Sequence, residues 1–316
     1  MAWGQREREV AGEIMRTDVF VQVFSESRDE RLMEADLDRA FEMFRSFESR
    51  FSRFREENEL ADLNQSTVCR VSDDLLEIML LCQRYYKETG GIFDPTILPI
   101  LEQEGYQSSF GTENFGVRIG GKSNRRYTFA DIQIDTLTQT ISKPLDCRID
   151  LGGIGKGYAV DCVARMLSEY YQDFLVDAGG DMYASGKNHG DHLPYFAIEI
   201  ENAFEEKARA ALLLVSDQAV ATSGVNRRRW QSEGKEKSHL IDVEKSESVM
   251  GDILTATTIA FSTVDADVMA KTLCILGRER GWSFAQRNRL PAFFLMKNGT
   301  IQINEFMKPF LWENHT

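Results

Sequence analysis

The residues with the clearest potential for chemistry lie in one glycine-rich stretch, residues 150–161, which reads DLGGIGKGYAVD. Its glycines fall where a strand is expected to give way to a helix, so backbone N–H groups and the helix dipole can favour an anion there. Lys156 adds a mobile cation at the same point. The spacing matches neither the dinucleotide fingerprint nor the phosphate loop. From spacing alone, a phosphate site and a glycine-rich turn with a solvated lysine stay equally open.

Carboxylates and a histidine are further candidates. Residues 177–181, DAGGD, place two carboxylates at a glycine turn; they either bind a cation or a ribose or cap their own turn, and the turn is favoured. His239 precedes an apolar Leu-Ile pair, and a lone histidine is more often structural than catalytic. Asp267 and Lys271 are four residues apart on an expected helix, a spacing typical of a surface ion pair of little consequence.

The hydrophobic pattern predicts the elements that must position these residues. An aromatic stripe at helical spacing over residues 31–54 indicates a core helix, and an Asn298-Gly299 pair between two apolar runs indicates a hairpin. The chain is therefore expected to be α+β, a single compact domain over residues 1–316 with largely antiparallel sheets flanked by a few amphipathic helices. Further helices are expected at residues 75–86, from residue 156 and at residues 266–276, and strands at residues 19–24, within 115–148, and at 174–176, 196–200, 212–215, 293–297 and 300–304.

Composition excludes several classes of protein. The 316 residues include 37 Lys and Arg against 50 Asp and Glu, a net charge of −13, which argues against binding to a nucleic-acid backbone. No apolar run is long enough to span a bilayer, so no membrane insertion is expected. The start of the chain lacks the pattern of a secretory signal, and five scattered cysteines indicate reduced core residues. These features predict a cytoplasmic protein.

Several short motifs occur in an order that points to one family. The set resembles the ApbE family, whose members are FAD:protein FMN transferases, over about residues 15–277. DLGGIGKGYAVD is the most distinctive of these motifs. The segments that carry the resemblance are residues 51–64 (FSRFREENELADLN), 91–96 (GIFDPT), 150–161, 177–181, 222–224 (TSG), 239–242 (HLID) and 266–270 (ADVMA).

The resemblance implies a flavin transfer. The pyrophosphate of FAD would be cleaved, AMP released, and FMN joined through a phosphoester to a Thr or Ser of an acceptor protein. His239 falls where the family has a histidine implicated in the transfer, and the intrinsic pKa of histidine suits proton acceptance. Mg²⁺ would be held by the backbone carbonyl of Gly153 and by the side chains of Asp267 and residue 271, here Lys271. Positions matching the family's FAD contacts are Met15, Phe54, Ile92, Phe93, Asp94, Asp150, Lys156, Ile241 and Ala270.

Three departures from the family bear on this expectation. Lys271 stands where the family places a threonine that binds the metal, and an ammonium has no lone pair to offer. The Ile-Asp-Pro-x-Thr-Gly loop reads IDVEKS at residues 241–246, and Arg16 replaces the glycine that follows Met15. An FAD-binding protein that stores or senses flavin without transferring it is therefore an alternative, as is an FAD pyrophosphatase that uses water as the acceptor.

Overall fold

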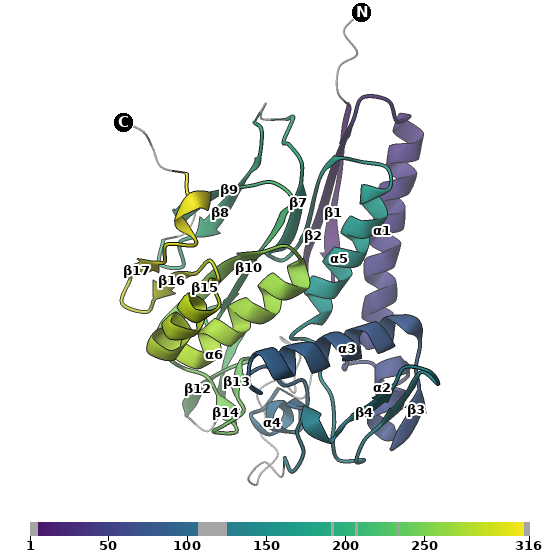
Figure 1. Ribbon diagram of the computed structural model, residues 1–316, viewed down its shortest axis with the longest axis vertical. Helices are drawn as coiled ribbons and strands as arrows, with labels where there is room; N and C mark the ends of the chain where they lie inside the picture. Colours follow the sequence, from purple (N-terminus) through teal and green to yellow (C-terminus); the bar gives the residue numbers. More distant parts are fainter. Residues whose placement is uncertain (1–5, 107–124, 191–192, 206–207, 233, 313–316) are drawn as a thin grey trace, which may run out of the picture.

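The protein is built around one large antiparallel sheet. The computed structural model describes residues 6–106, 125–190, 193–205, 208–232 and 234–312 (Figure 1). Eight strands are ordered β1-β2-β6-β7-β10-β15-β16-β17, and every neighbouring pair is antiparallel, as expected for the α+β class. The strands are β1 (Arg6–Ile14), β2 (Thr17–Ser25), β6 (Asp173–Ala178), β7 (Asp181–Ser185), β10 (Gln218–Gly224), β15 (Ile253–Ala260), β16 (Phe293–Met296) and β17 (Ile301–Ile303).

The two faces of this sheet are covered by different elements. Val19, Val21 and Val23 alternate along β2 and join the core beneath the helices. Phe24 has the opposite orientation because successive strand residues point to opposite faces. Its ring lies 6.3 Å from the ring of Phe196 on the hairpin formed by β8 (Phe196–Glu201) and β9 (Arg209–Val215). Each face of the sheet therefore contributes to a hydrophobic core.

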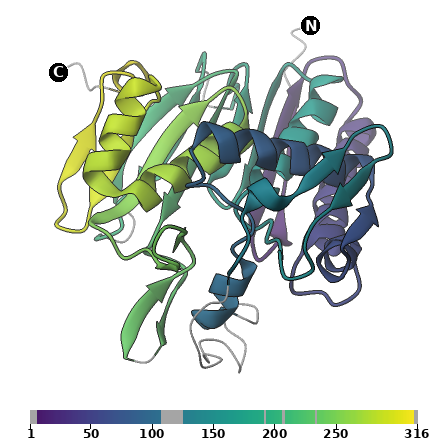
Figure 2. The same ribbon diagram turned by 60° about the horizontal axis from the view of Figure 1, so that its bottom comes forward.

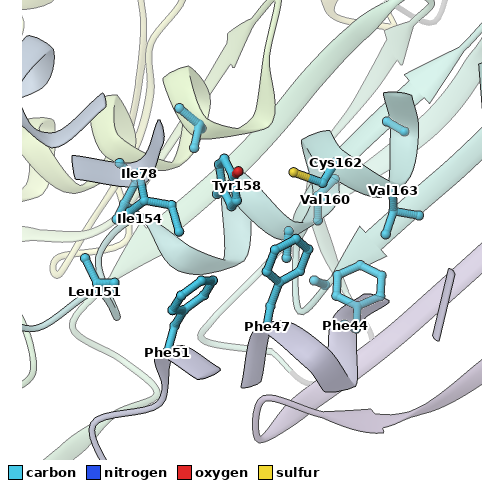
Figure 3. Close-up of a cluster of buried hydrophobic side chains, with 14 of the residues drawn as sticks. Phe44, Phe47, Phe51, Ile78, Leu151, Ile154, Tyr158, Val160, Cys162 and Val163 are labelled. Carbon is cyan, nitrogen blue, oxygen red and sulfur yellow. The ribbon is translucent and has the colours of Figure 1, made fainter. Parts of the chain in front are cut away.

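The aromatic stripe forms the contact between α1 (Glu30–Phe51) and α5 (Gly155–Ser168) (Figure 3). Phe44 and Phe47 of α1 are buried, and the ring of Phe47 meets that of Tyr158 edge-on at 5.5 Å. The prediction of a core helix is confirmed, but α1 ends at Phe51 rather than at residue 54. Phe54 lies beyond the helix and is 38% exposed, so it is not part of the core stripe.

The backbones of α5 and α6 (Thr263–Arg287) approach each other closely. A Cβ on Gly157 would lie 2.9 Å from both the carbonyl oxygen of Thr263 and the Cα of Val264, so only glycine fits at this crossing. Asp161, one turn further along α5, accepts hydrogen bonds from the backbone N–H groups of Thr263 (2.7 Å) and Val264 (2.9 Å). The stretch expected to bind phosphate therefore also holds the N-terminus of α6 in place.

Helix α6 is longer than the sequence indicates. Helical spacing predicts a helix over residues 266–276, and α6 has a backbone break one residue later, at Gly277 with φ 73°. A second helical segment then continues to Arg287. Glycine adopts this left-handed conformation at little cost, which lets the two segments stay joined.

Smaller elements surround the helical side of the sheet. Figure 2 shows the β11–β12 hairpin and α4 projecting together from one end. No helix among the described residues is long and apolar enough to cross a membrane. The strand-like stretch expected within residues 115–148 falls partly outside the described residues; its described part contains β4 and β5. These elements are α2 (Glu59–Gln65), β3 (Val68–Arg70), α3 (Asp73–Glu88), α4 (Leu98–Gln103), β4 (Gln133–Asp135), β5 (Thr140–Ser142), β11 (Arg229–Ser232), β12 (Lys235–Ser238), β13 (Ile241–Asp242) and β14 (Glu247–Ser248).

The close approach at Gly157 predicts a large effect of one methyl group. Gly157→Ala is expected to lower the free energy of unfolding by about 1–3 kcal/mol, because the new Cβ meets backbone atoms that cannot rotate away. Gly155→Ala is the matched control in the same helix, since a Cβ there meets nothing within 4 Å. Its change should stay within about 1 kcal/mol. Urea unfolding measures both, and equal midpoints for the two variants would contradict the packing argument.

Candidate active site

One cavity collects most of the residues singled out by the sequence. It has a volume of about 1350 Å³ and lies between the end of α1, the segment before α4, the start of α5, the residues around β13 and the inner face of α6. Of the expected site residues, only Asp267 and Ala270 do not line it. Ala270 lies fully buried against Ala219 and Ala221 of β10, so its side chain is part of the core.

The start of α5 forms a polar wall of the cavity. Gly153 and Lys156 line it, and no described side chain caps the first residues of this helix. An uncapped helix N-terminus leaves backbone N–H groups available to an anion. The Lys156 ammonium forms an ion pair with Asp181 of the DAGGD turn, so both glycine motifs meet here. Asp177 instead accepts a 2.7 Å hydrogen bond from the Gly180 N–H, as expected for a turn-capping residue.

His239 lies among positive charges. It follows β12 directly, lines the cavity, and its backbone N–H donates to the carbonyl of Arg228. Burial lowers the pKa of His239 to about 3, and the charges of Arg228, Lys271 and Lys156 add to the lowering. The residue type suggested a pKa near the intrinsic value of histidine; the pKa is lower because partial burial and the neighbouring cations disfavour the charged imidazolium. The imidazole is neutral at physiological pH, and its buried Nδ1 has no partner among the described residues.

The cavity also has an aromatic wall. The guanidinium of Arg53 lies 4.3 Å from the ring centre of Phe54 and 4.5 Å from that of Tyr106. The Tyr106 ring in turn lies 5.4 Å from that of Trp230 on β11. Arg53 is held in this position by a 2.6 Å ion pair with Asp150, which is almost fully buried. Flat rings and a planar guanidinium at the edge of a cavity are suited to stacking against an aromatic ligand.

Two expected FAD contacts occupy structural positions. The Asp94 carboxylate is buried and is held by the Arg125 guanidinium, the Thr96 backbone N–H (2.9 Å) and the Thr96 hydroxyl (2.7 Å). Its side chain therefore stabilises the loop, next to Ile92 and Phe93, which line the cavity beside it. Ile241 lines the cavity from β13 and also belongs to a small buried cluster with Trp230.

Met15 lines the cavity from the turn between β1 and β2. Both Met15 and the next residue, Arg16, have φ 55°, in the left-handed region. Glycine adopts this conformation without a penalty, whereas an arginine is strained in it. Arg16 therefore keeps the left-handed backbone conformation of the turn, at a cost in conformational energy.

The three positions expected to bind metal, 153, 267 and 271, lie close together, and Lys271 is next to both of the others. The Lys271 Cδ lies 3.8 Å from where a Cβ on Gly153 would be, and the Lys271 ammonium forms an ion pair with Asp267. The pair is not on the surface, as its spacing suggested: Asp267 is fully buried and Lys271 is 9% exposed, because α5 and β10 cover this face of α6. Burial lowers the pKa of Lys271, and the charges of Lys156 and Arg228 act in the same direction.

This donor set does not fit Mg²⁺. The ion requires octahedral oxygen ligands, usually including one or two carboxylates. Asp267 Oδ1 accepts the Lys271 ammonium, and only Oδ2 is left without a partner among the described residues. A charged lysine offers no lone pair and repels a dication. Nor does any group of three His, Cys, Asp or Glu side chains in the described ranges form a metal-binding cluster.

Comparison with known proteins places this site in a family. The sequence profile of the ApbE family matches residues 15–294, most of the chain. The chain belongs to the ApbE family. The match starts at Met15 in the cavity and includes both glycine motifs, His239 and Lys271.

Relatives and solved structures agree with this assignment. The FAD:protein FMN transferase of Vibrio cholerae is 28% identical over 276 residues, which cover 85% of this chain and 80% of that protein. The FAD:protein FMN transferase of Haemophilus influenzae is 25% identical, and the alignment covers 94% of this chain and 90% of that protein. The structure of the flavin transferase ApbE from Vibrio cholerae superposes with a TM-score of 0.81 at 25% identity, covering 98% of this chain and all of that one. The ApbE protein of Thermotoga maritima, 21% identical with a TM-score of 0.86, shares the fold.

Sequence reasoning missed Arg53, Tyr106 and Arg228 as cavity residues. Arg53 lies inside a family motif, but nothing in the sequence pairs it with Asp150, almost a hundred residues later. Arg228 is the middle residue of an Arg-Arg-Arg run, which has the appearance of a solvated charge cluster. Only the β11–β12 hairpin places it in the cavity.

The surroundings of His239 predict its protonation state. Its imidazole should show no inflection between pH 5 and pH 8, because burial and three cations disfavour the charged form. The measurement is the pH dependence of the histidine Cε1–H resonances in NMR spectra, with His239→Gln used to assign the signal. An inflection near pH 6.5 for that signal would contradict this account of the site.

Proposed function

We propose that this chain transfers FMN from FAD to a Thr or Ser hydroxyl of an acceptor protein and releases AMP. The observation that carries the proposal is a neutral, half-buried histidine that shares one cavity with Lys156, Arg228, Lys271 and the uncapped start of α5. A cavity with this charge suits a pyrophosphate, and the aromatic wall suits a flavin or an adenine ring. Family membership and the names of the relatives support the same reaction.

The proposed step uses the chain's own residues. The acceptor hydroxyl oxygen attacks the phosphorus of the FMN half, and the bond from that phosphorus to the bridging oxygen breaks. The electron pair of that bond leaves with AMP, and the hydroxyl proton passes to Nδ1 of His239, the nitrogen that lacks a partner among the described residues. Lys156 and the N–H groups of α5 stabilise the charge on the phosphates. Magnesium, which the resemblance implies, has no step here because the donors at positions 153, 267 and 271 do not fit it.

We also propose that residues 1–316 act as one unit. The cavity takes lining residues from Glu13 near the end of β1 to Ile275 in α6, so its lining comes from most of the length of the chain. The FAD contacts proposed for this unit are those residues named from the resemblance that line the cavity: Met15, Phe54, Ile92, Phe93, Asp94, Asp150, Lys156 and Ile241.

A second function is favoured by one observation, the ion pair between Lys271 and Asp267. If this pair abolishes the chemistry, the chain binds FAD without transferring flavin. An FAD pyrophosphatase would instead pass the phosphoryl group to water. These alternatives differ in their products, so one experiment separates all three.

The test combines FAD with an acceptor fragment that carries the family's target threonine. We expect AMP, measured by chromatography, together with covalent flavin fluorescence on the fragment. The same fragment with that threonine changed to alanine should remain unlabelled. His239→Asn should lower the transfer rate by about 10²–10⁴-fold while FAD still binds, because only proton transfer is removed.

The remaining outcomes identify the alternatives. AMP and free FMN that appear at the same rate without any fragment would show a pyrophosphatase. FAD bound without AMP under every condition would show a flavin-binding protein. A failure to bind FAD would overturn all three.

A further inference from the structure

Lys271 is one of the cations that line the cavity near the start of α5. It lies beside Gly153, at the uncapped start of α5, and it lines the same cavity as His239. Its side chain extends from α6 through a fully buried environment and is anchored by Asp267. Lys271 is therefore a fixed part of the site and not a mobile surface side chain.

The Lys271 ammonium still has donors to offer. Its one hydrogen bond among the described residues goes to Asp267 Oδ1. An ammonium carries three N–H groups, so two are available to oxygens of a ligand in the cavity. The side chain of Arg228 also lines the cavity and makes no hydrogen bond or ion pair with the other described residues. Its five donors are equally available.

The charges near the start of α5 come from side chains. The Lys271 ammonium neutralises Asp267, as a cation bound there would. Lys156 is likewise paired with Asp181. The side chain of Arg228 makes no such pair with the other described residues, so it adds one net positive charge near His239.

We propose that Lys271, together with Arg228, replaces the divalent cation at the pyrophosphate, so that this chain handles FAD without a metal. The proposal rests on the flavin-transfer function proposed above. In this arrangement Asp267 anchors the lysine, and the free N–H groups of Lys271 and Arg228 bind phosphate oxygens. Charge-assisted hydrogen bonds of this kind are strong in a site that excludes water.

The first test needs no variant. Wild-type protein is freed of metal with a chelator, loaded with FAD and given the acceptor fragment, and its AMP release is compared with and without Mg²⁺. The two rates should agree within about two-fold, far less than the 10²–10³-fold effect typical of removing one charge-stabilising group. In parallel, Mn²⁺ is titrated into the FAD complex and followed by its electron paramagnetic resonance signal. No stoichiometric binding is expected.

The second test restores the family's residue. Lys271→Thr should lose AMP release in the chelator by about 10²-fold and regain it with Mg²⁺, and it should bind one Mn²⁺. Lys87→Thr is the matched control, because Lys87 is an exposed lysine on another helix, α3, and does not line the cavity. It should behave as the wild type in both measurements. Should Lys271→Thr not fold, the wild-type comparison decides alone.

Two results would overturn the proposal: wild-type turnover abolished by the chelator and restored by Mg²⁺, or one Mn²⁺ bound by the wild-type FAD complex. Failure of the function itself is distinguishable. If FAD binds but no AMP forms, the Mn²⁺ titrations decide: a site absent in the wild type and present in Lys271→Thr supports cation replacement, and any other pattern of binding overturns it.

Discussion

The close contact between the backbones of α5 and α6 is the constraint on which the site depends. At Gly157 the absence of a side chain lets the two helices touch, and Asp161 then accepts two hydrogen bonds from the start of α6. The contact brings the start of one helix against the inner face of the other. Lys156 and Gly153 thereby face Lys271, although more than a hundred residues separate them in the sequence.

The second constraint is electrostatic. A chain of net charge −13 concentrates several cations in one cavity, and a buried charge is destabilising unless it is paired. Three pairs meet this requirement: Lys156 with Asp181, Lys271 with Asp267, and Arg53 with Asp150. Arg228 has no such partner among the described residues and leaves an unpaired positive charge near His239. The protein thus accommodates an anionic ligand without a positive surface overall.

The departures from the family are accommodated in different ways. In the loop that lacks the family's proline and glycine, Asp242 accepts hydrogen bonds from the backbone N–H groups of Glu244 (3.0 Å) and Lys245 (3.1 Å), which hold a tight turn. Arg16 retains a left-handed backbone that glycine would adopt more easily. These two changes preserve the backbone conformation of the segments in which they occur. The change at Lys271 alters the chemistry of the site, because a cation stands where a metal ligand is expected.

The sequence by itself determined the fold class, the longer helices and four of the eight strands of the large sheet (β2, β6, β16 and β17), because hydrophobic periodicity is a local property of the chain; it gave no sign of β1, β7, β10 or β15. Short glycine motifs, also local, indicated the candidate site. The helix at α5 and the hairpin of β16 and β17 were predicted in this way, whereas the continuation of α6 beyond Gly277 was not. Only the tertiary structure decided which charges are buried and with what partners. In the structure the ion pair of Asp267 and Lys271 is buried in the core, although its spacing suggested a surface pair. Ala270 packs against β10, although it was expected to contact FAD. The tertiary structure also showed that Arg53 and Arg228 line the cavity. The physical reason is that burial, and with it the strength of every charge interaction, depends on segments far apart in sequence that meet only when the chain is folded.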